Sequence, residues 1–300
     1  MSDIRALSEG LADAVAVVGV SLVELRGARR PGTGVVFDEE HVVTASHVIR
    51  REEGIAVSLS DGQERTASLV GRDPSTDLAL LKVADGGLVP VKWSTDTLRV
   101  GQLVLPVGRL RGRLRTSLGM ISDLSGAWQT SRGGQIDTWI EVDATLPPGL
   151  SGGALIDTSG RALGLNTSGL SHRGAVLPHA TVVRVARRLQ EHGTIAPGYL
   201  GVGFYPGSLP DDVAALAGQA DALMSVSLEP GGPGEQAGVH VGDALVRLDG
   251  DAVTGLRHLV GLLAARGAGA EVVLTVVRAG KLKDVRVTLG IRPQRRGWCG

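Results

Sequence analysis

Short apolar runs separated by glycine-rich turns fill this sequence from Val17 to about Asn166 and limit its possible folds. Helical periodicity is scarce across this stretch, so we predict a barrel or sandwich of antiparallel strands and not an α/β sheet. The high glycine count, 44 residues, agrees with a turn-rich, mostly β protein. The runs expected to form strands are GVVFD, HVVTA, IAVSLS, ASLVG, LALLKV, GQLVLPVG, TWIEVD, GALID and RALGLNT.

The last third of the chain reads as a second unit. A helix is expected from Thr181 to His192, and residues 193–198, which include Pro197, resemble a linker. Because 300 residues are long for one core, we predict two domains, at residues 1–194 and 198–292. In the second we expect strands at LMSVSL, ALVRLDG, EVVLTVVR and DVRVTLG, and helices at Pro210–Ala217 and Leu256–Ala265.

Charge and cysteine content exclude several classes of protein. Thirty-one basic residues balance thirty-one acidic ones, so no net charge attracts the chain to nucleic acid or to a membrane surface. Cys299 is the only cysteine, which excludes a disulfide framework and a cysteine-built metal site. The remaining histidines show no metal-ligand spacing, and we expect neither a metal nor a cofactor; they are His41, His172, His179, His192, His240 and His258.

The N-terminus lacks the basic and apolar regions of a signal peptide. Its most apolar stretch, from Ala14 to Val23, is too short to cross a bilayer. We expect a short helix through Leu7, Leu11 and Ala14, followed by a strand from Val17 to Leu25. The sequence therefore predicts a cytoplasmic protein, or a periplasmic one if a leader has been removed from this chain.

Three segments together carry the residues of a hydrolytic site. His47 follows an apolar strand in VVTASHVI, Asp77 precedes another in GRDPSTDLALLKV, and Ser151 lies in a glycine-flanked turn in LPPGLSGGALID. A serine hydroxyl needs a neighbouring base to act as a nucleophile, and a histidine held by a carboxylate is such a base. The order His, Asp, Ser is that of the chymotrypsin-type barrel proteases.

The glycines beside Ser151 suit an oxyanion hole. In barrel proteases the backbone amides of the serine and of the residue two before it bind the developing oxyanion. Here those residues are Ser151 and Gly149, with Leu150 between them. Gly149 and Gly152 permit a sharp turn and carry no side chain that could block the substrate carbonyl.

GLSGG also matches the G-x-S-x-G elbow of α/β-hydrolases, in which an acid and then a histidine follow the serine. Asp157 with His172, His179 or His192 would then complete the triad. However, GALID after the serine is strand-like, and no alternating strand–helix pattern surrounds it. The sequence therefore favours the barrel-protease order.

Four arginines alternate in GRLRGRLRTS, at positions 109, 111, 113 and 115. In a single strand they would share one face, which could bind an acidic peptide or nucleic acid. A solvated hairpin near the active site explains them better, given the zero net charge.

TASHVI, DPSTDLALLKV and PPGLSGGALID resemble the three catalytic blocks of the HtrA (DegP/DegS-like) family of trypsin-like serine proteases. GRALGLNT is similar to the strand that borders that family's substrate cleft, and PGYLGVGF with the segments after it resembles its PDZ domain. The resemblance implies two six-stranded β-barrels followed by an α+β PDZ domain. It also implies His47 as the general base, Asp77 as its orienting acid and Ser151 as the nucleophile.

The resemblance extends to ligands. It implies that Tyr199, Leu200, Gly201 and Val202 form a loop that binds the C-termini of peptides, and that the protease degrades unfolded or damaged proteins. Family members form trimers through N-terminal aromatic residues that this chain lacks, so the sequence leaves a homo-oligomer open.

Several positions depart from the family pattern. Leu150 replaces the usual Asn and Ala154 replaces the usual Pro. Thr145, six residues before the serine, stands where trypsin-like selection of Lys or Arg needs an acid, so we expect cleavage after Val, Ala or Leu. The alternative is a proteolytically dormant chaperone or PDZ peptide-binding protein.

Overall fold

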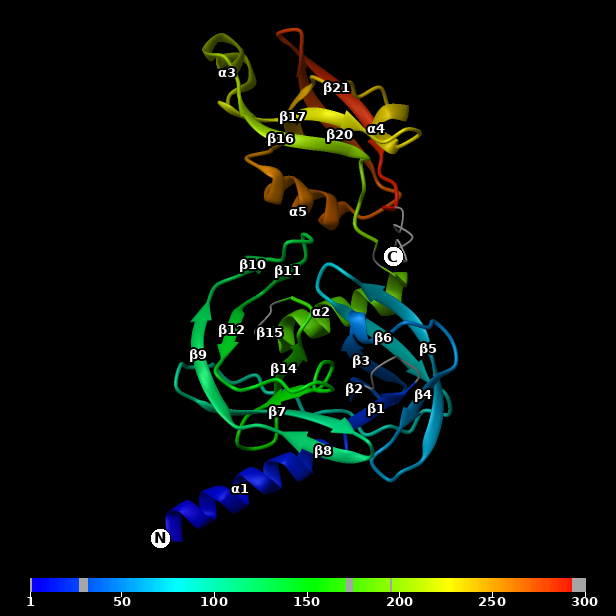
Figure 1. Cartoon of the computed structure of the whole chain (residues 1–300), viewed down its shortest axis with the longest axis vertical. Coiled ribbons are helices and arrows are strands. Elements are labelled where there is room, and N and C mark those ends of the chain that lie inside the picture. Colours follow the sequence, from blue (N-terminus) through cyan, green and yellow to red (C-terminus); the bar gives the residue numbers. More distant parts are fainter. Residues whose placement is uncertain (1, 27–31, 171–174, 195, 293–300) are drawn as a thin grey trace, which may run out of the picture. The chain divides into compact units, whose positions relative to one another are not determined.

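A computed structural model describes residues 2–26, 32–170, 175–194 and 196–292 (Figure 1). The chain folds into two compact units, one built mainly from residues up to 195 and the other from residue 196 onward. His172, which the α/β-hydrolase alternative invoked, lies outside the described residues.

The first half of the N-terminal unit is a closed barrel of six antiparallel strands in the order β1-β2-β3-β6-β5-β4. Its interior is apolar, because alternate side chains of each strand point inward and are Val, Leu, Ile or Ala. The strands are β1 (Leu22–Arg26), β2 (Gly32–Val36), β3 (His41–Ala45), β4 (Ile55–Ser58), β5 (Glu64–Asp73) and β6 (Leu78–Val83).

The second half is a nearly closed barrel with the strand order β12-β9-β7-β13-β14-β15, whose end strands contact each other. A further strand, β8, pairs only with β7, and β10 pairs with β11 as a separate ribbon. The predicted double barrel is therefore confirmed. These strands are β7 (Leu103–Leu110), β8 (Arg113–Thr116), β9 (Gly119–Ser125), β10 (Trp128–Gln129), β11 (Gln135–Ile136), β12 (Trp139–Val142), β13 (Ala154–Ile156), β14 (Ala162–Thr167) and β15 (Ala175–Pro178).

One apolar core joins the two barrels. It combines side chains of the first barrel, such as Leu78 and Leu80, with side chains of the second, such as Leu165 and Leu177. Helix α2 (His179–His192) closes this junction, because it contacts β5 and β6 of one barrel and β14 and β15 of the other. The barrels are thus packed as one body.

The N-terminal helix is longer than the sequence suggested. Helix α1 (Ser2–Gly19) continues through Val17, where we expected a strand to begin, and β1 starts only at Leu22. Ala14 and Val18 lie four residues apart on one helical face and are buried in the core between the barrels. Val17 lies on the exposed face of this helix. The predicted start of the strand at Val17 is wrong, because the burial of Val18 keeps this segment helical.

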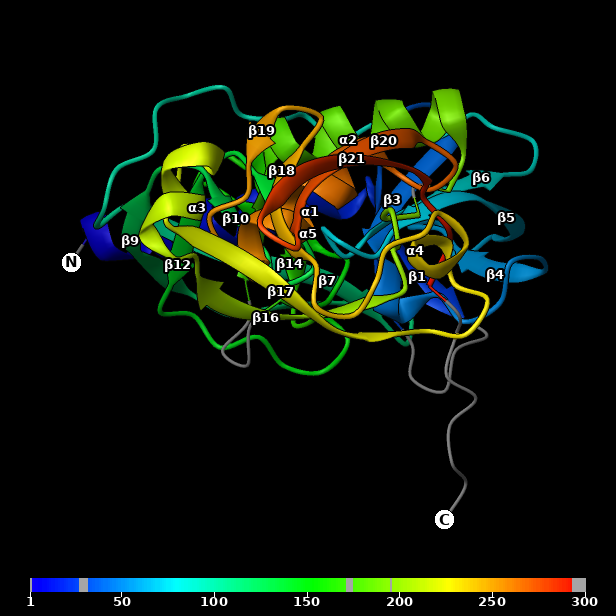
Figure 2. The ribbon, with the colours of Figure 1, turned by 90° about the horizontal axis from the view of Figure 1, so that it is seen from above.

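The C-terminal unit is an antiparallel sheet in the order β16-β17-β18-β20-β21, with β16 at one edge (Figure 2). Helix α5 contacts β16. The elements are β16 (Val202–Ser208), α3 (Asp211–Ala217), β17 (Asp221–Leu228), α4 (Pro233–Gln236), β18 (Ala244–Leu248), β19 (Asp251–Ala252), α5 (Leu256–Arg266), β20 (Glu271–Arg278) and β21 (Lys281–Thr288).

The arginine-rich segment forms a β7–β8 hairpin whose turn contains Arg111 in the left-handed region, with φ of 54°. Its first arginine, Arg109, is buried and does not share a face with the others. The Arg109 side chain donates to the carbonyls of Gly19 (2.7 Å), Leu22 (2.8 Å) and Gly112 (3.2 Å). Burial lowers the pKa of Arg109, and the nearby Glu24 carboxylate opposes that shift. Arg109 therefore ties the end of α1 and the start of β1 to the second barrel.

We predict that Arg109→Met destabilises the protein by about 3 kcal/mol, because three backbone carbonyls lose their donor. Thermal unfolding monitored by circular dichroism measures this loss. Arg113→Met is the matched control, since Arg113 is exposed on the same hairpin and its side chain makes no hydrogen bond to another described residue. Equal melting temperatures for the two variants would contradict the role assigned to Arg109.

Candidate active site

His47 and Asp77 form a hydrogen-bonded pair at one end of the first barrel, beside the paired ends of β3 and β6. The Nδ1 atom of His47 lies 2.7 Å from Oδ2 of Asp77, and the backbone amide of His47 donates to Oδ1 at 3.0 Å. The Asp77 side chain is only 3% exposed, whereas that of His47 is 39% exposed. Because a carboxylate only accepts hydrogen bonds, Nδ1 carries the proton and Nε2 is left as the basic nitrogen.

The barrel brings these two residues together through strand pairing. β3 ends at Ala45 directly opposite Leu78, the first residue of β6, so His47 and Asp77 leave adjacent strand ends. Asp77 has a φ of 59°, a conformation that Asp adopts more readily than most residues. Its backbone carbonyl accepts from the amide of Ser46 at 2.8 Å, which fixes the turn that carries His47.

The turn before Asp77 is held by Asp73. The carboxylate of Asp73 accepts from the Ser75 amide (2.9 Å), the Ser75 hydroxyl (2.5 Å) and the Thr76 hydroxyl (2.9 Å). This local hydrogen bonding replaces water around a buried carboxylate and makes the segment rigid. Asp77 therefore follows a turn whose shape is already fixed by these hydrogen bonds.

Thr167, at the end of β14 in the second barrel, completes the surroundings of Asp77. Its hydroxyl donates to Oδ2 of Asp77, and its side chain is fully buried. The Thr167 hydroxyl also accepts from the amide of Gly169 at 2.9 Å. The buried carboxylate is thus satisfied by donors from both barrels.

Ser151 lies in a turn that only glycine-rich sequence allows. Gly149 and Gly152 have φ values of 98° and 83°. A Cβ atom on Gly152 would lie 2.1 Å from the carbonyl oxygen of Thr33 and 2.2 Å from the hydroxyl of Thr44, so even alanine cannot fit there. The turn is therefore pressed against β2 and β3 of the first barrel.

The amides of this turn divide into two groups. The Leu150 amide donates to the Pro147 carbonyl at 3.2 Å. Among the described residues, the amides of Gly149 and Ser151 have no acceptor. Two free amides that are separated by one residue can bind a developing oxyanion. Leu150, which we grouped with them from the sequence, instead buries its side chain with 1% exposure.

Thr33 holds the Ser151 turn from the opposite side. Its hydroxyl donates to the Gly149 carbonyl at 2.8 Å, and its amide donates to the Ser151 carbonyl at 3.2 Å. The Thr33 hydroxyl also accepts from the amide of Arg109 at 3.0 Å. No signal in the sequence marked Thr33, because nothing in a strand residue predicts contacts to a turn more than a hundred positions away.

The Ser151 hydroxyl does not hydrogen-bond to His47 in this structure. Its Oγ atom lies 3.0 Å from Oγ of Ser168 and 3.3 Å from the Ser168 amide nitrogen. The next residue, Gly169, lies against the other two members of the site, since a Cβ there would be 2.2 Å from Oδ2 of Asp77. The structure therefore gathers all three residues around one segment, 167–169, but joins only His47 and Asp77 directly.

Thr145 lies in the loop before the serine turn. Its side chain is exposed, and its carbonyl accepts from the Ser117 hydroxyl at 2.6 Å. It brings no charge to this part of the site. The hydrogen bond from Ser117 holds the backbone of the loop, and the Thr145 side chain takes no part in it.

Asp157, the acid of the α/β-hydrolase alternative, closes a local turn. Its carboxylate accepts from the Ser159 amide (2.8 Å), the Ser159 hydroxyl (2.6 Å) and the Arg161 amide (3.1 Å). Among the described residues, Asp157 forms no hydrogen bond or ion pair with a histidine. His179 instead stacks on Trp93, and burial lowers the pKa of its imidazole.

In the C-terminal unit, residues 199–202 form a loop that enters the edge strand β16. Gly201 has a φ of 68°, and among the described residues the amides of Leu200 and Gly201 have no acceptor. The hydroxyl of Tyr199 donates to Glu229 at 2.6 Å, and this hydrogen bond raises the pKa of the tyrosine. The loop thus offers free donors at the end of an open sheet edge.

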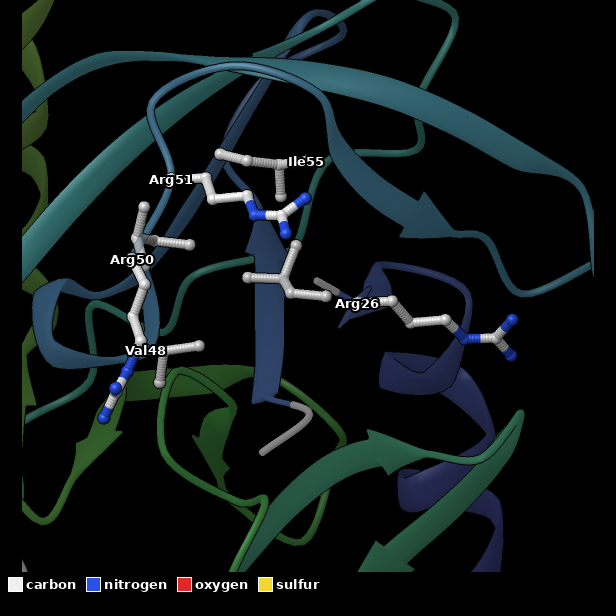
Figure 3. Close-up of a pocket in the computed structure, with 7 residues that line it drawn as sticks. Arg26, Val48, Arg50, Arg51 and Ile55 are labelled. Atoms are coloured by element: carbon white, nitrogen blue, oxygen red, sulfur yellow. The ribbon is translucent and has the colours of Figure 1, made fainter. Parts of the chain in front are cut away.

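A small pocket lies beside the turn that carries His47 (Figure 3). Arg26 pairs with Glu64, whereas Arg50 and Arg51 have no hydrogen bond or ion pair to another described residue. The pocket is lined by apolar side chains and by arginines, and no Asp, Glu or His lines it. Its apolar walls are Leu25, Val48, Ile49 and Ile55.

Comparisons with known proteins agree with this description. The family described as trypsin-like peptidase domain matches residues 32–165, and the PDZ domain family matches residues 198–289. A "probable periplasmic serine endoprotease DegP-like" of Brucella suis is 33% identical over 91% of this chain and 56% of its own length. A "probable periplasmic serine protease do/HhoA-like" of Haemophilus influenzae is 31% identical over 88% of this chain and 59% of its own length. The chain thus spans little more than half of these curated relatives.

Solved structures extend the likeness to the whole fold. The HtrA-type protease AlgW with a decapeptide superposes with a TM-score of 0.70 at 26% identity, covering 94% of this chain and 99% of that one. The serine endoprotease from Yersinia pestis gives 0.72 at 26% identity, covering 94% and 98%. In the described part of this chain, no helix is long and apolar enough to cross a membrane.

We predict that Gly169→Ala lowers the reactivity of Ser151 towards a fluorophosphonate reagent by about 10²-fold, because its Cβ would displace the Asp77 carboxylate. The labelling rate under pseudo-first-order conditions measures this. Gly126→Ala is the matched control, since nothing lies within 4 Å of its Cβ position. Labelling of the Gly169 variant at the wild-type rate would contradict the packing of this segment on the carboxylate.

Proposed function

This chain belongs to the HtrA family of serine proteases, and we propose on that basis that it hydrolyses peptide bonds of unfolded or damaged polypeptides. The observation that carries the proposal is the buried Asp77 carboxylate bonded to Nδ1 of His47, close to a serine turn with two free amides. This combination supplies a base, a nucleophile and an oxyanion hole without a cofactor.

The reaction would proceed through an acyl-enzyme. Nε2 of His47 takes the proton from Ser151 as Oγ attacks the scissile carbonyl carbon, and Asp77 stabilises the imidazolium that forms. The imidazolium then gives its proton to the leaving amine as the peptide C–N bond breaks. Water, activated by the same imidazole, hydrolyses the ester and returns the serine hydroxyl.

The amides of Gly149 and Ser151 would bind the oxyanion of each tetrahedral intermediate. Loss of one such donor typically lowers kcat by about 10²- to 10³-fold. Leu150 would contribute through its buried side chain, which packs against Gly108 and anchors the turn. On this proposal, the hole would form with leucine in place of the asparagine that the family usually has here.

The substrate residue before the scissile bond would be Val, Ala or Leu. Thr145 provides no negative charge for a lysine or arginine side chain. An uncompensated guanidinium in an uncharged pocket would lose its hydration without an ion pair, which makes basic residues poor substrates here. Exposed aliphatic residues are common in unfolded chains, which agrees with a quality-control role.

The C-terminal unit would bind the C-termini of polypeptides. The free amides of Leu200 and Gly201 suit a terminal carboxylate, and the open edge of β16 can accept an added antiparallel strand. Among the side chains of β16, Phe204 packs on the core beside α5 and would contact the bound peptide. Such binding would recruit substrates or regulate the protease.

We place the activity outside the cytoplasm. The Brucella and Haemophilus relatives are named as periplasmic proteins, which supports the periplasmic alternative and not the cytoplasmic prediction made from the N-terminus. Unfolded polypeptides that cannot reach cytoplasmic proteases are suitable substrates in that compartment.

A second function, that of a dormant chaperone or peptide-binding protein, is favoured by one observation. Ser151 is bonded to Ser168 and not to His47, so the nucleophile and its base are not yet paired. A protein kept in this arrangement would bind polypeptides without cleaving them.

We predict that the protein degrades casein and that Ser151→Ala abolishes both this degradation and labelling by a fluorophosphonate probe. Asp77→Asn should lower kcat by about 10³- to 10⁴-fold, because His47 loses the partner that fixes its tautomer. Asp123→Asn, on an exposed strand position, is the control. Mass spectrometry of the products should place cleavage after Val, Ala or Leu.

The dormant alternative would be correct if the wild type is never labelled, even with peptides bound to the PDZ domain. Products that end mainly in Arg or Lys would contradict the specificity assigned to Thr145.

We predict that peptides with a free C-terminal carboxylate bind at least about tenfold more tightly than the same peptides with an amidated end, because the Leu200 and Gly201 amides form charge-assisted hydrogen bonds. Fluorescence anisotropy on the full chain carrying Ser151→Ala measures both affinities without cleavage. Equal affinities would exclude this loop as a carboxylate site.

A further inference from the structure

Ser168 is the only described residue that hydrogen-bonds to the Ser151 hydroxyl. Both contacts come from it, one from its Oγ atom at 3.0 Å and one from its amide at 3.3 Å. Ser168 directly follows β14 and lies between Thr167 and Gly169, which contact Asp77. The same short segment therefore supports the carboxylate and engages the nucleophile.

Either direction of the bond between the two hydroxyls lowers the reactivity of Ser151. A serine hydroxyl has one proton and two lone pairs. If Ser151 donates to Ser168, its proton is directed away from Nε2 of His47. If Ser168 donates instead, its hydroxyl and its amide occupy both lone pairs of the Ser151 oxygen. In neither case is a lone pair free to attack while the proton faces the base.

The position of Ser168 is set by its neighbours. Thr167 is fully buried, donates to Asp77 and pairs with Ala175 across β14 and β15. Gly169 donates to the Thr167 hydroxyl and has no room for a Cβ beside the carboxylate. Ser168 has little freedom between these two residues, although its own side chain is exposed. Its contact with Ser151 is therefore a consequence of the backbone.

We propose that Ser168 is a positioning residue that holds the Ser151 hydroxyl away from His47 in the ligand-free protein. The proposal rests on the proposed serine-protease function and adds a restraint to it. Reaction requires the bond to Ser168 to break so that Ser151 can donate to Nε2 of His47. Removal of the Ser168 hydroxyl should accordingly make the nucleophile more reactive, which loss of a merely structural residue would not do.

The test compares the second-order rate of fluorophosphonate labelling in the full chain. Ser168→Ala should react about three- to tenfold faster than the wild type, the effect expected for loss of one hydrogen bond. Ser168→Thr keeps the hydroxyl and should label at close to the wild-type rate. Ser125→Ala removes an exposed hydroxyl elsewhere and serves as the matched control. Ser168→Gly repeats the test in case the alanine variant does not fold.

The outcomes separate this inference from the proposed function. Faster labelling of Ser168→Ala with an unchanged melting temperature, reversed in Ser168→Thr, supports the restraint. A rate equal to or below the wild type in folded Ser168→Ala and Ser168→Gly overturns it, while labelling of wild-type Ser151 leaves the protease function standing. Absence of labelling in the wild type and in every variant overturns both.

Discussion

Burial of the Asp77 carboxylate is the constraint around which the rest of the site is arranged. A carboxylate with 3% of its surface exposed must be surrounded by donors, since an unpaired buried charge is strongly destabilising. The donors come from the backbone and imidazole of His47 and from the Thr167 hydroxyl. Each of these groups is thereby fixed in orientation, and the basic nitrogen of His47 faces outward as a result.

Much of this arrangement follows from local sequence. Period-two apolar runs predict strands wherever they occur, so a barrel or sandwich of antiparallel strands could be anticipated from the pattern. The His47, Asp77 and Ser151 blocks indicated the candidate triad, and the double barrel was implied by their resemblance to the HtrA family. A second unit after a linker could also be predicted from the pattern, and the resemblance implied that this unit is a PDZ domain. These features depend on neighbours in sequence, which is the information that patterns contain.

The remaining features depend on contacts between distant segments. Arg109 appeared as one of four alternating arginines, yet it is buried because α1 ends where its guanidinium can meet the carbonyls of Gly19 and Leu22. Val17 was expected in a strand, yet burial of Val18 extends the helix. Ser168 gave no signal, because one serine after a strand is ordinary until the fold brings it beside Ser151.

The hydrogen bond from Thr167 to Asp77 crosses from one barrel to the other, as do the bonds from Thr33 to the Ser151 turn. Neither barrel by itself holds all the residues of the proposed active site. A nascent or partly refolded chain, in which only the first barrel has formed, would lack the proposed nucleophile, Ser151, beside the His47 imidazole. Under the proposed function, this division would protect the protein against digesting itself during synthesis, because proteolytic competence would arise only once both barrels have docked.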